Sequence, residues 1–165
     1  MSEIQHETKY DVVGVGNAIV DIIAQTEDDF LSREDIHKGS MTLIDADRTK
    51  HLFEKMGPTT TVSGGSAANT IAGIAGLGGK AAYIGKVFND HLGTGFAHDM
   101  KALGIHYPTL AAETGAPTAC CIILVTPDGQ RSMNTFLGAS TDFNLGDVDE
   151  ATIAASQIVY LEGYL

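Results

Sequence analysis

Short runs of apolar and β-branched residues alternate along the chain with longer segments of helix-forming residues. The apolar runs predict strands at about residues 10–16, 40–44, 59–63, 80–87 and 158–161. The intervening segments predict helices at about residues 27–36, 45–55, 66–78, 91–103 and 147–156. This order is typical of a layered α/β fold.

Two of the predicted helices carry clear local signals. Asp90 is placed to cap the helix that begins at His91, and Gly104 is placed to end it. The helix that ends near Gly78 consists almost wholly of small apolar residues, so we expect it to be buried.

Two further β-rich runs, residues 118–125 and 130–137, are joined by Thr-Pro-Asp-Gly, which predicts a β-hairpin. An antiparallel hairpin within an alternating α/β pattern indicates an accessory sheet, and such a sheet often serves as a lid. Asp21 interrupts another apolar run, which indicates either an edge position or a site.

The composition narrows the range of partners. With 44% hydrophobic residues among 165, the chain is long enough for one globular domain with a core. Its formal charge of -11 argues against nucleic acid and anionic membranes as partners. The first residues do not resemble a secretory leader, and no run approaches the ~18 apolar residues of a membrane span. We therefore expect a cytoplasmic protein.

The cysteines and histidines do not indicate a metal site. Cys120 and Cys121 are adjacent, so on a strand they point to opposite faces, and we interpret them as small buried apolar residues. No pair of the six histidines has the spacing of a helical zinc motif.

Phosphate-binding glycine motifs are missing or weak. The chain contains no G-x-x-x-x-G-K-[ST] sequence, which excludes a P-loop. Gly14-Val15-Gly16 follows a predicted strand, but Ile19 occupies the position where a dinucleotide fingerprint needs its third glycine. A protein that binds NAD stays open as a weaker alternative.

Two polar motifs indicate a binding site instead. Asn17 and Asp21 follow a predicted core strand, at the edge where open α/β sheets bind ligands, and an amide beside a carboxylate suits sugar hydroxyls. A predicted helix begins within the motif Gly64-Gly65-Ser66-Ala67-Ala68-Asn69. The free N–H groups of a helix start, and glycines without side chains, let a polar ligand approach closely. The structural alternatives are a turn asparagine, an aspartate that caps backbone, and a well-capped buried helix.

The ordered set of motifs resembles a known family. GNAIVD at 16–21, GGSAAN at 64–69, IGKVFNDHLG at 84–93 and DGQRSMNTFLGAS at 128–140 are similar, in order and spacing, to the ribokinase, or phosphofructokinase-B, family of carbohydrate kinases. The resemblance covers nearly the whole chain. Ile71, the hairpin turn and residues 160–165 look like the adenosine kinase branch.

This resemblance implies a ribokinase-like layered α/β core with an inserted small β-sheet lid, whose segments lie near residues 18–45 and 116–138. Residues 1–165 would form the amino-terminal, acceptor-binding part of the kinase domain. The family's Gly-Ala-Gly-Asp motif, with its anion hole and catalytic aspartate, does not occur here, and Gly138-Ala139-Ser140-Thr141 lacks its second glycine and its acid. We expect ATP and Mg2+, with a monovalent cation as a further candidate, to bind mainly to a carboxyl-terminal half, and the chain alone to be inactive.

The resemblance also assigns roles to individual residues. Those expected to hold ribose or sugar hydroxyls are Asn17, Asp21, Gly64, Gly65, Ser66 and Asn69. Those expected to contact the base are Thr42, Ile44, Met133, Thr135, Leu137, Tyr164 and Leu165. Arg131 is expected near the transferring phosphoryl group, where a guanidinium offsets developing charge. The alternatives are core packing for the base contacts and a solvated turn position for the arginine.

The implied function is ATP-dependent phosphorylation of the 5'-hydroxyl of adenosine by the complete protein. Simple sugars such as ribose, fructose or 2-keto-3-deoxygluconate are the alternative acceptors. A non-catalytic module that binds a sugar or nucleoside is a further alternative. The partner would be a small molecule, and the protein would be a monomer or a homodimer.

Overall fold

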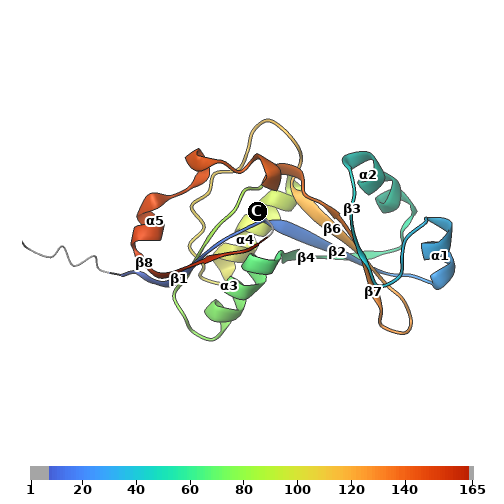
Figure 1. Ribbon diagram of the computed structural model, residues 1–165, viewed down its shortest axis with the longest axis horizontal. Coiled ribbons are helices and arrows are strands. Elements are labelled where there is room, and N and C mark those ends of the chain that lie inside the picture. The colour runs from blue at the N-terminus through green and yellow to red at the C-terminus, as the bar shows by residue number, and fades with distance from the viewer. Residues whose placement is uncertain (1–7, 164–165) are drawn as a thin grey trace, which may run out of the picture.

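The computed structural model describes residues 8–163, which form two sheets placed side by side along the long axis of the molecule (Figure 1). The first, called the core sheet, has three parallel strands in the order β5 (Ala81–Ile84), β1 (Tyr10–Val15) and β8 (Ser156–Leu161). The predicted strands in these three regions are therefore confirmed. β1 is the middle strand, and its residues Val12 to Val15 are buried on both faces, as their apolar run predicts.

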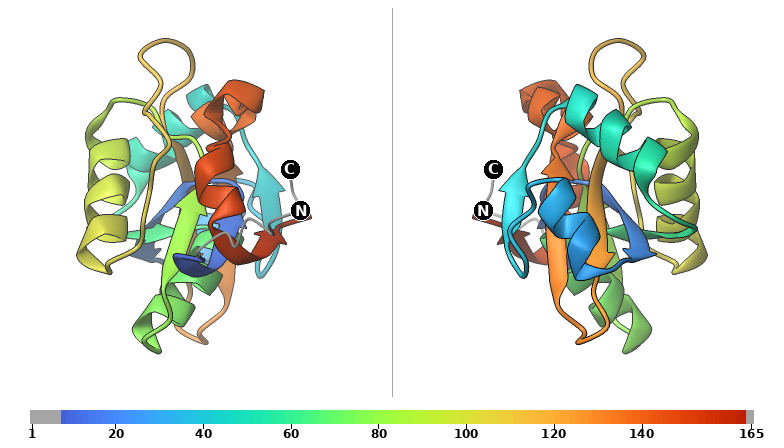
Figure 2. Two further views of the ribbon diagram at one scale, coloured as in Figure 1. Left: turned by 90° about the vertical axis from the view of Figure 1, so that its left-hand side faces the viewer. Right: turned by 90° about the vertical axis from the view of Figure 1, so that its right-hand side faces the viewer.

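One face of the core sheet is covered by α3 (Ser66–Gly76) and α4 (His91–Ala102) (Figure 2). Tyr83 of β5 is fully buried there among side chains that include Ile71 of α3 and Phe96 of α4. The predicted caps of α4 are confirmed, because Asp90 accepts a 2.8 Å hydrogen bond from the N–H of Gly93, and Gly104 has a φ of 72° just beyond the helix.

The predicted burial of α3 is wrong for much of its surface. Ala67, Ala68 and Ile71 are buried, but Gly73 is exposed, and Leu77, just after the helix, is 92% exposed. The helix packs on the core sheet through one stripe, and its other side faces outward. The lack of a polar face did not predict burial because small residues leave little apolar surface to cover.

The opposite face of the core sheet carries α5 (Glu150–Ala154), whose Ile153 packs against the buried side chains of β1 and β5. This helix is shorter than the segment 147–156 that the sequence predicts. The polypeptide before it forms two short 3-10 helices, Gly138–Asp142 and Leu145–Asp147.

The second sheet has five strands in the order β3 (Met41–Leu43), β7 (Arg131–Phe136), β6 (Ala119–Val125), β2 (Ile19–Gln25) and β4 (Thr59–Gly64). β6 and β7 form the predicted antiparallel hairpin. β2 lies between β6 and β4, so Asp21 does not occupy an edge strand. β4 falls outside the segments 18–45 and 116–138, and sequence patterns did not place it in this sheet.

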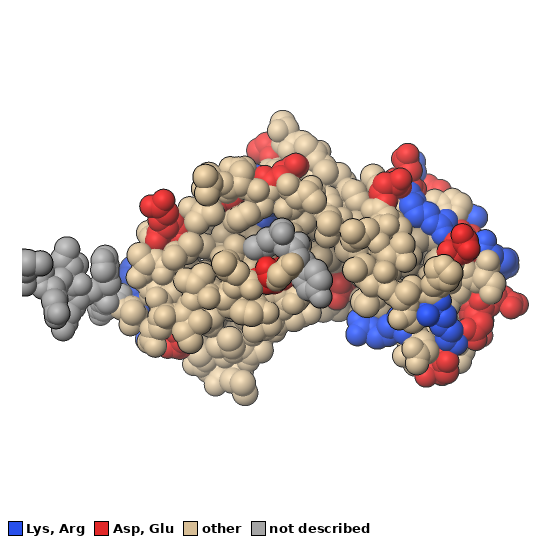
Figure 3. Space-filling view, viewed as in Figure 1, with Lys and Arg blue, Asp and Glu red and all other residues tan. Residues whose placement is uncertain are grey.

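The far end of the second sheet carries α1 (Asp28–Arg33) and α2 (Ala46–Lys55) (Figure 1). Charged side chains gather at this end, whereas the middle of the face shown in Figure 3 is mainly uncharged. Within residues 8–163, no helix combines the length and apolar character that crossing a membrane requires.

Candidate functional site

A cavity of about 510 Å3 lies where the core sheet meets the second sheet, and we call it the inter-sheet cavity. Its volume falls in the ~300–1,000 Å3 range of small-molecule sites. Its walls are formed by Asn17, Ile19, Asp21, Met41, Leu43, Gly65, Ser66, Asn69, Cys121, Ile123, Arg131, Met133, Thr135, Leu137 and Glu162. These residues come from distant parts of the sequence, so the fold itself assembles the cavity.

The structure brings five of the six expected hydroxyl-binding residues to this cavity. Asn17 follows β1 and Asp21 lies in β2, while Gly65, Ser66 and Asn69 belong to the first turn of α3 or the residue before it. The two polar motifs, almost fifty residues apart in sequence, therefore share one wall. Their role in binding stays a prediction.

Gly64 is not part of the cavity wall, but it makes room for a residue that is. A Cβ atom at Gly64 would lie 2.5 Å from Asp21 Oδ2, so any side chain here would displace the carboxylate. At Gly65 the φ angle is 97°, and a Cβ atom would lie 2.5 Å from the carbonyl oxygen of Asn17. Both glycines thus allow the loop before α3 to approach the residues that follow β1.

A cross-strand row of the second sheet extends the cavity wall from Asp21. Asp21 pairs with Cys121, Cys121 with Thr135, and Thr135 with Leu43, so all four side chains lie on the face that lines the cavity. The next row adds Ile123, Met133 and Met41. Met133, Thr135 and Leu137 line the cavity, and their contact with a base stays a prediction.

The expected positions of Thr42 and Ile44 are wrong. Thr42 pairs with Asn134 on the other face of the sheet, and Ile44 packs against the apolar cluster that includes Leu52 of α2. Successive residues of a strand point to opposite faces, and β3 has only three residues, too few for a hydrophobic alternation to fix its register. Met41 and Leu43 occupy the positions that we assigned to their neighbours. Tyr164 and Leu165 lie outside the described residues.

Cys120 and Cys121 are both buried, as expected, but they do not have equivalent surroundings. Cys121 lines the cavity, and its sulfur accepts a 3.2 Å hydrogen bond from the hydroxyl of Thr135. Burial raises the pKa of the Cys121 thiol, so this part of the wall is a neutral, weakly polar surface.

Asp21 and Arg131 carry the opposite charges that face the cavity from the second sheet. Burial raises the pKa of Asp21, and the positive charge of Arg131 partly opposes this rise. Arg131 lines the cavity and is also exposed to solvent. A guanidinium in this position can attract an anionic group to the cavity.

Glu162, which directly follows β8, is a cavity residue that the sequence analysis missed. It is 6% exposed, and its two carboxylate oxygens accept hydrogen bonds from the backbone N–H groups of Asn17 and Ala67, at 2.6 and 2.9 Å. A single side chain therefore joins the loop after β1 to the first turn of α3. A charged residue directly after an apolar strand was the signal that could have found it.

The dinucleotide-binding alternative is not supported by the fold. A dinucleotide fingerprint places the pyrophosphate at the N-terminus of the helix that follows the first strand. Here β1 is followed by β2, so Ile19 begins a strand instead of lying in a helix.

Comparison with known proteins assigns the chain to a family. Residues 11–165 match the model described as pfkB family carbohydrate kinase. The chain belongs to this family. The matched segment includes every residue that lines the inter-sheet cavity.

Relatives of this pfkB-family chain include nucleoside and sugar kinases. The crystal structure of adenosine kinase from Sinorhizobium meliloti is 52% identical with a TM-score of 0.90, and the match covers 96% of this chain and 48% of that chain. Adenosine kinase 2 from Arabidopsis thaliana is 25% identical over 93% of this chain and 46% of its own length. A fructokinase from Solanum tuberosum is 32% identical over 50% of this chain and 26% of its own length. The chain thus spans at most about half the length of these relatives.

Proposed function

We propose that the complete protein transfers the γ-phosphoryl group of ATP to the 5'-hydroxyl of adenosine, and that this pfkB-family chain supplies the acceptor site. The observation that carries the proposal is the polarity of the inter-sheet cavity. Its hydrogen-bonding side chains Asn17, Asp21, Ser66 and Asn69 come from the loop after β1, from β2 and from the first turn of α3, whereas its apolar side chains Met41, Leu43, Ile123, Met133 and Leu137 come from β3, β6, β7 and the residue after β7. A nucleoside has the same division, with a hydroxyl-rich ribose at one end and a planar base at the other.

The polar end is suited to the ribose. Asn17 and Asn69 each offer amide donors and an acceptor, while the Asp21 carboxylate offers acceptors for sugar hydroxyls. Gly65 lines the cavity beside them, and its lack of a side chain permits the close contact with Asn17. Phosphoryl transfer needs the acceptor hydroxyl fixed in line with the γ-phosphate, and these contacts would provide that orientation.

The apolar end is suited to the base. Leu43, Ile123, Met133 and Leu137 form a surface on which a purine could bury its faces, and the sulfur of Cys121 lies beside them. A simple sugar carries hydroxyls around its ring and would leave this surface without an apolar partner. We propose that the second sheet acts as a lid that closes over the acceptor and excludes water.

ATP would deliver the transferred group with Mg2+ screening its charge, and Arg131 is the residue of this chain assigned to the phosphoryl group. Within residues 8–163, no group of three His, Cys, Asp or Glu side chains is placed to hold a metal ion. The proposal therefore assigns most contacts with MgATP to residues beyond this chain.

The proposal is tested by ATP-dependent phosphorylation with the full-length natural protein, with adenosine compared against ribose, fructose and 2-keto-3-deoxygluconate. We expect kcat/KM for adenosine to exceed that for each sugar by at least ~100-fold, because only adenosine fills the apolar end. Preference for a sugar would contradict the assignment of the acceptor while leaving the kinase assignment intact. Inactivity towards every acceptor would contradict the proposed function itself.

A simple sugar is the second candidate acceptor, and it is supported by the likeness to the fructokinase from Solanum tuberosum. That likeness covers only half of this chain, whereas the adenosine kinase from Sinorhizobium meliloti matches 96% of it. Variants at the apolar end distinguish the two candidates. Met133→Ala should raise KM for adenosine if the base lies there, and should leave KM for a simple sugar nearly unchanged.

A further inference from the structure

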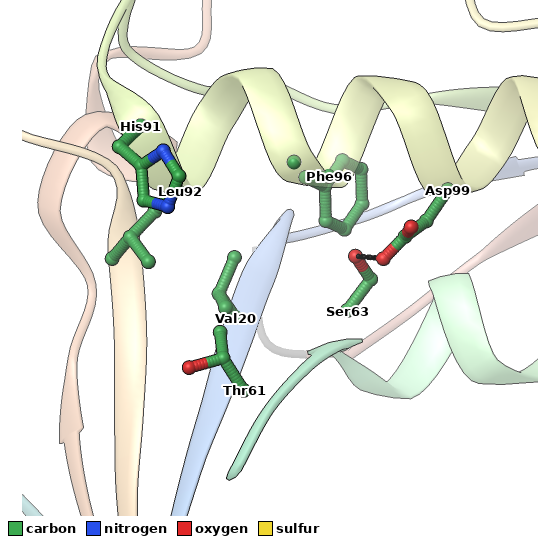
Figure 4. A pocket seen from close by; sticks show the side chains of 8 residues that line it. Val20, Thr61, Ser63, His91, Leu92, Phe96 and Asp99 are labelled. Atoms are coloured by element: carbon green, nitrogen blue, oxygen red, sulfur yellow. Dashed lines mark hydrogen bonds between the residues drawn. The ribbon is translucent and has the colours of Figure 1, made fainter. Parts of the chain in front are cut away.

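Helix α4 holds two strands of the second sheet at two separate points. Near its beginning, both carboxylate oxygens of Asp90 bind Thr118, which directly precedes β6. Near its end, Asp99 Oδ2 accepts a 2.6 Å hydrogen bond from the hydroxyl of Ser63 in β4 (Figure 4). The two attachments lie about two and a half helical turns apart, so α4 supports both β6 and β4.

The two attachments differ in strength. Asp90 accepts bonds from the hydroxyl and the backbone N–H of Thr118, at 2.7 and 2.9 Å, and also from the N–H of Gly93. Thr118 is 1% exposed, so water cannot readily replace these bonds. Asp99 holds Ser63 by a single bond, and its side chain is 50% exposed. Water can therefore compete for the second attachment but not for the first.

Packing around the second attachment is also incomplete. A cavity of about 130 Å3 separates α4 from β4, with Gly95 and His91 on the helix and Thr61 on the strand among its lining residues. Figure 4 shows this cavity beside the bond between Ser63 and Asp99. Side chains around a void lose the dispersion contacts that a filled interface would provide. The joint between β4 and α4 therefore lacks part of the packing that a filled interface would have.

The weaker attachment is connected directly to the proposed acceptor site. Ser63 is followed by Gly64, which packs against the carboxylate of Asp21, and by Gly65, which lines the inter-sheet cavity. A movement of Ser63 away from Asp99 would carry this loop with it. We propose that Asp99 is a positioning residue that acts through Ser63 as a releasable latch, while the Asp90–Thr118 attachment is the fixed pivot about which the lid turns.

This inference rests on the proposed function for its effect on catalysis, but the latch itself can be tested without activity. Ser63→Ala removes the donor, and Asp99→Ala removes the acceptor. Asp99→Asn keeps an acceptor oxygen and serves as the conservative rescue. Lys101→Ala changes an exposed residue of the same helix and serves as the matched control.

The first measurement is amide hydrogen exchange of the full-length protein without any ligand. In Ser63→Ala and Asp99→Ala we expect exchange at residues 59–65 to become about three- to tenfold faster, as for the loss of one partly exposed hydrogen bond. Exchange at residues 119–125, next to the pivot, should stay within about twofold of the wild type. Equal exchange at residues 59–65 in the wild type and both alanine variants would overturn the latch.

The second measurement is steady-state kinetics with the acceptor that the wild type phosphorylates best. Both alanine variants should raise KM for this acceptor about three- to tenfold with kcat changed less than about twofold, because a loop that must be repositioned weakens binding. Asp99→Asn and Lys101→Ala should retain the wild-type KM. Faster exchange with an unchanged KM would overturn the coupling of the latch to the acceptor site. A wild type without activity would refute the proposed function, and the exchange comparison would still decide the latch.

Discussion

Glu162 offers a sharp test of how the acceptor site is held together. Its carboxylate joins the N–H of Asn17 to the N–H of Ala67, and both bonds are buried. Glu162→Gln keeps the size of the side chain, but its amide can present only one acceptor oxygen. The amide nitrogen must then face the second N–H, where two donors meet without an acceptor between them.

The size of the effect follows from these contacts. A hydrogen bond to a charged acceptor contributes about 1.5–3 kcal/mol, so Glu162→Gln should reduce the free energy of unfolding by about 2 kcal/mol. Glu162→Ala loses both bonds and leaves two buried donors unpaired, so we expect a reduction of about 3–5 kcal/mol. Because the loops also carry Asn17 and the first turn of α3, acceptor binding should weaken by about tenfold or more in Glu162→Gln.

Urea unfolding and calorimetric titration with the acceptor, both on the full-length protein, measure these effects. Glu150→Gln, at an exposed glutamate of α5, is the matched control and should behave like the wild type. A Glu162→Gln protein with unchanged stability and unchanged acceptor affinity would refute the idea that this carboxylate holds the two loops. A loss of stability without any loss of affinity would refute its connection to the site.

Three further outcomes follow from other residues. Asp21→Asn should lower kcat/KM for the acceptor by about 100-fold. The same variant should be more stable in thermal unfolding at neutral pH, because burial raises the folded-state pKa of Asp21 and the ionised carboxylate is unfavourable above that pKa. Decreased stability would contradict this. Gly65→Ala should reduce the free energy of unfolding by at least about 2 kcal/mol because of its positive φ and the contact with Asn17, and urea unfolding indistinguishable from the wild type would contradict it. Hydrogen bonds from Lys55, His51 and Arg48 lower the pKa of Glu34 from 4.5 to about 2. In acid unfolding, the wild type should therefore be more stable than Glu34→Gln by a constant amount above pH 4.5, and this difference should vanish as the pH falls towards about 2. A difference that persists unchanged at that pH would contradict the assignment.

Local sequence signals predicted most of the elements and the residues that meet at the polar end of the cavity. Asp90 lies at the start and Gly104 just after the end of a helix at the predicted position. The turn at residues 126–129 joins the two strands of the expected hairpin. These features depend on residues that are close together in the sequence, so the sequence alone predicts them. The resemblance to a family adds a link that local signals lack, because the order and spacing of its motifs assign Asn17, Asp21 and the glycine loop to one site.

Features that depend on tertiary contacts could not be predicted in the same way. The face to which Thr42 points is set by pairing of β3 with β7, and three residues contain no alternation that reports it. The role of Glu162 depends on two backbone groups about one hundred residues or more away in sequence. The exposure of α3 depends on which elements cover it, and its composition alone did not indicate its single packing stripe.

A crystal structure of the full-length protein with adenosine bound tests the central claim most directly. We expect the ribose to lie against Asn17, Asp21 and Asn69, and the base to lie against Met133 and the other apolar side chains of the second sheet. Adenosine bound elsewhere, or bound in the inter-sheet cavity with its base at the polar end, would contradict the proposed acceptor site.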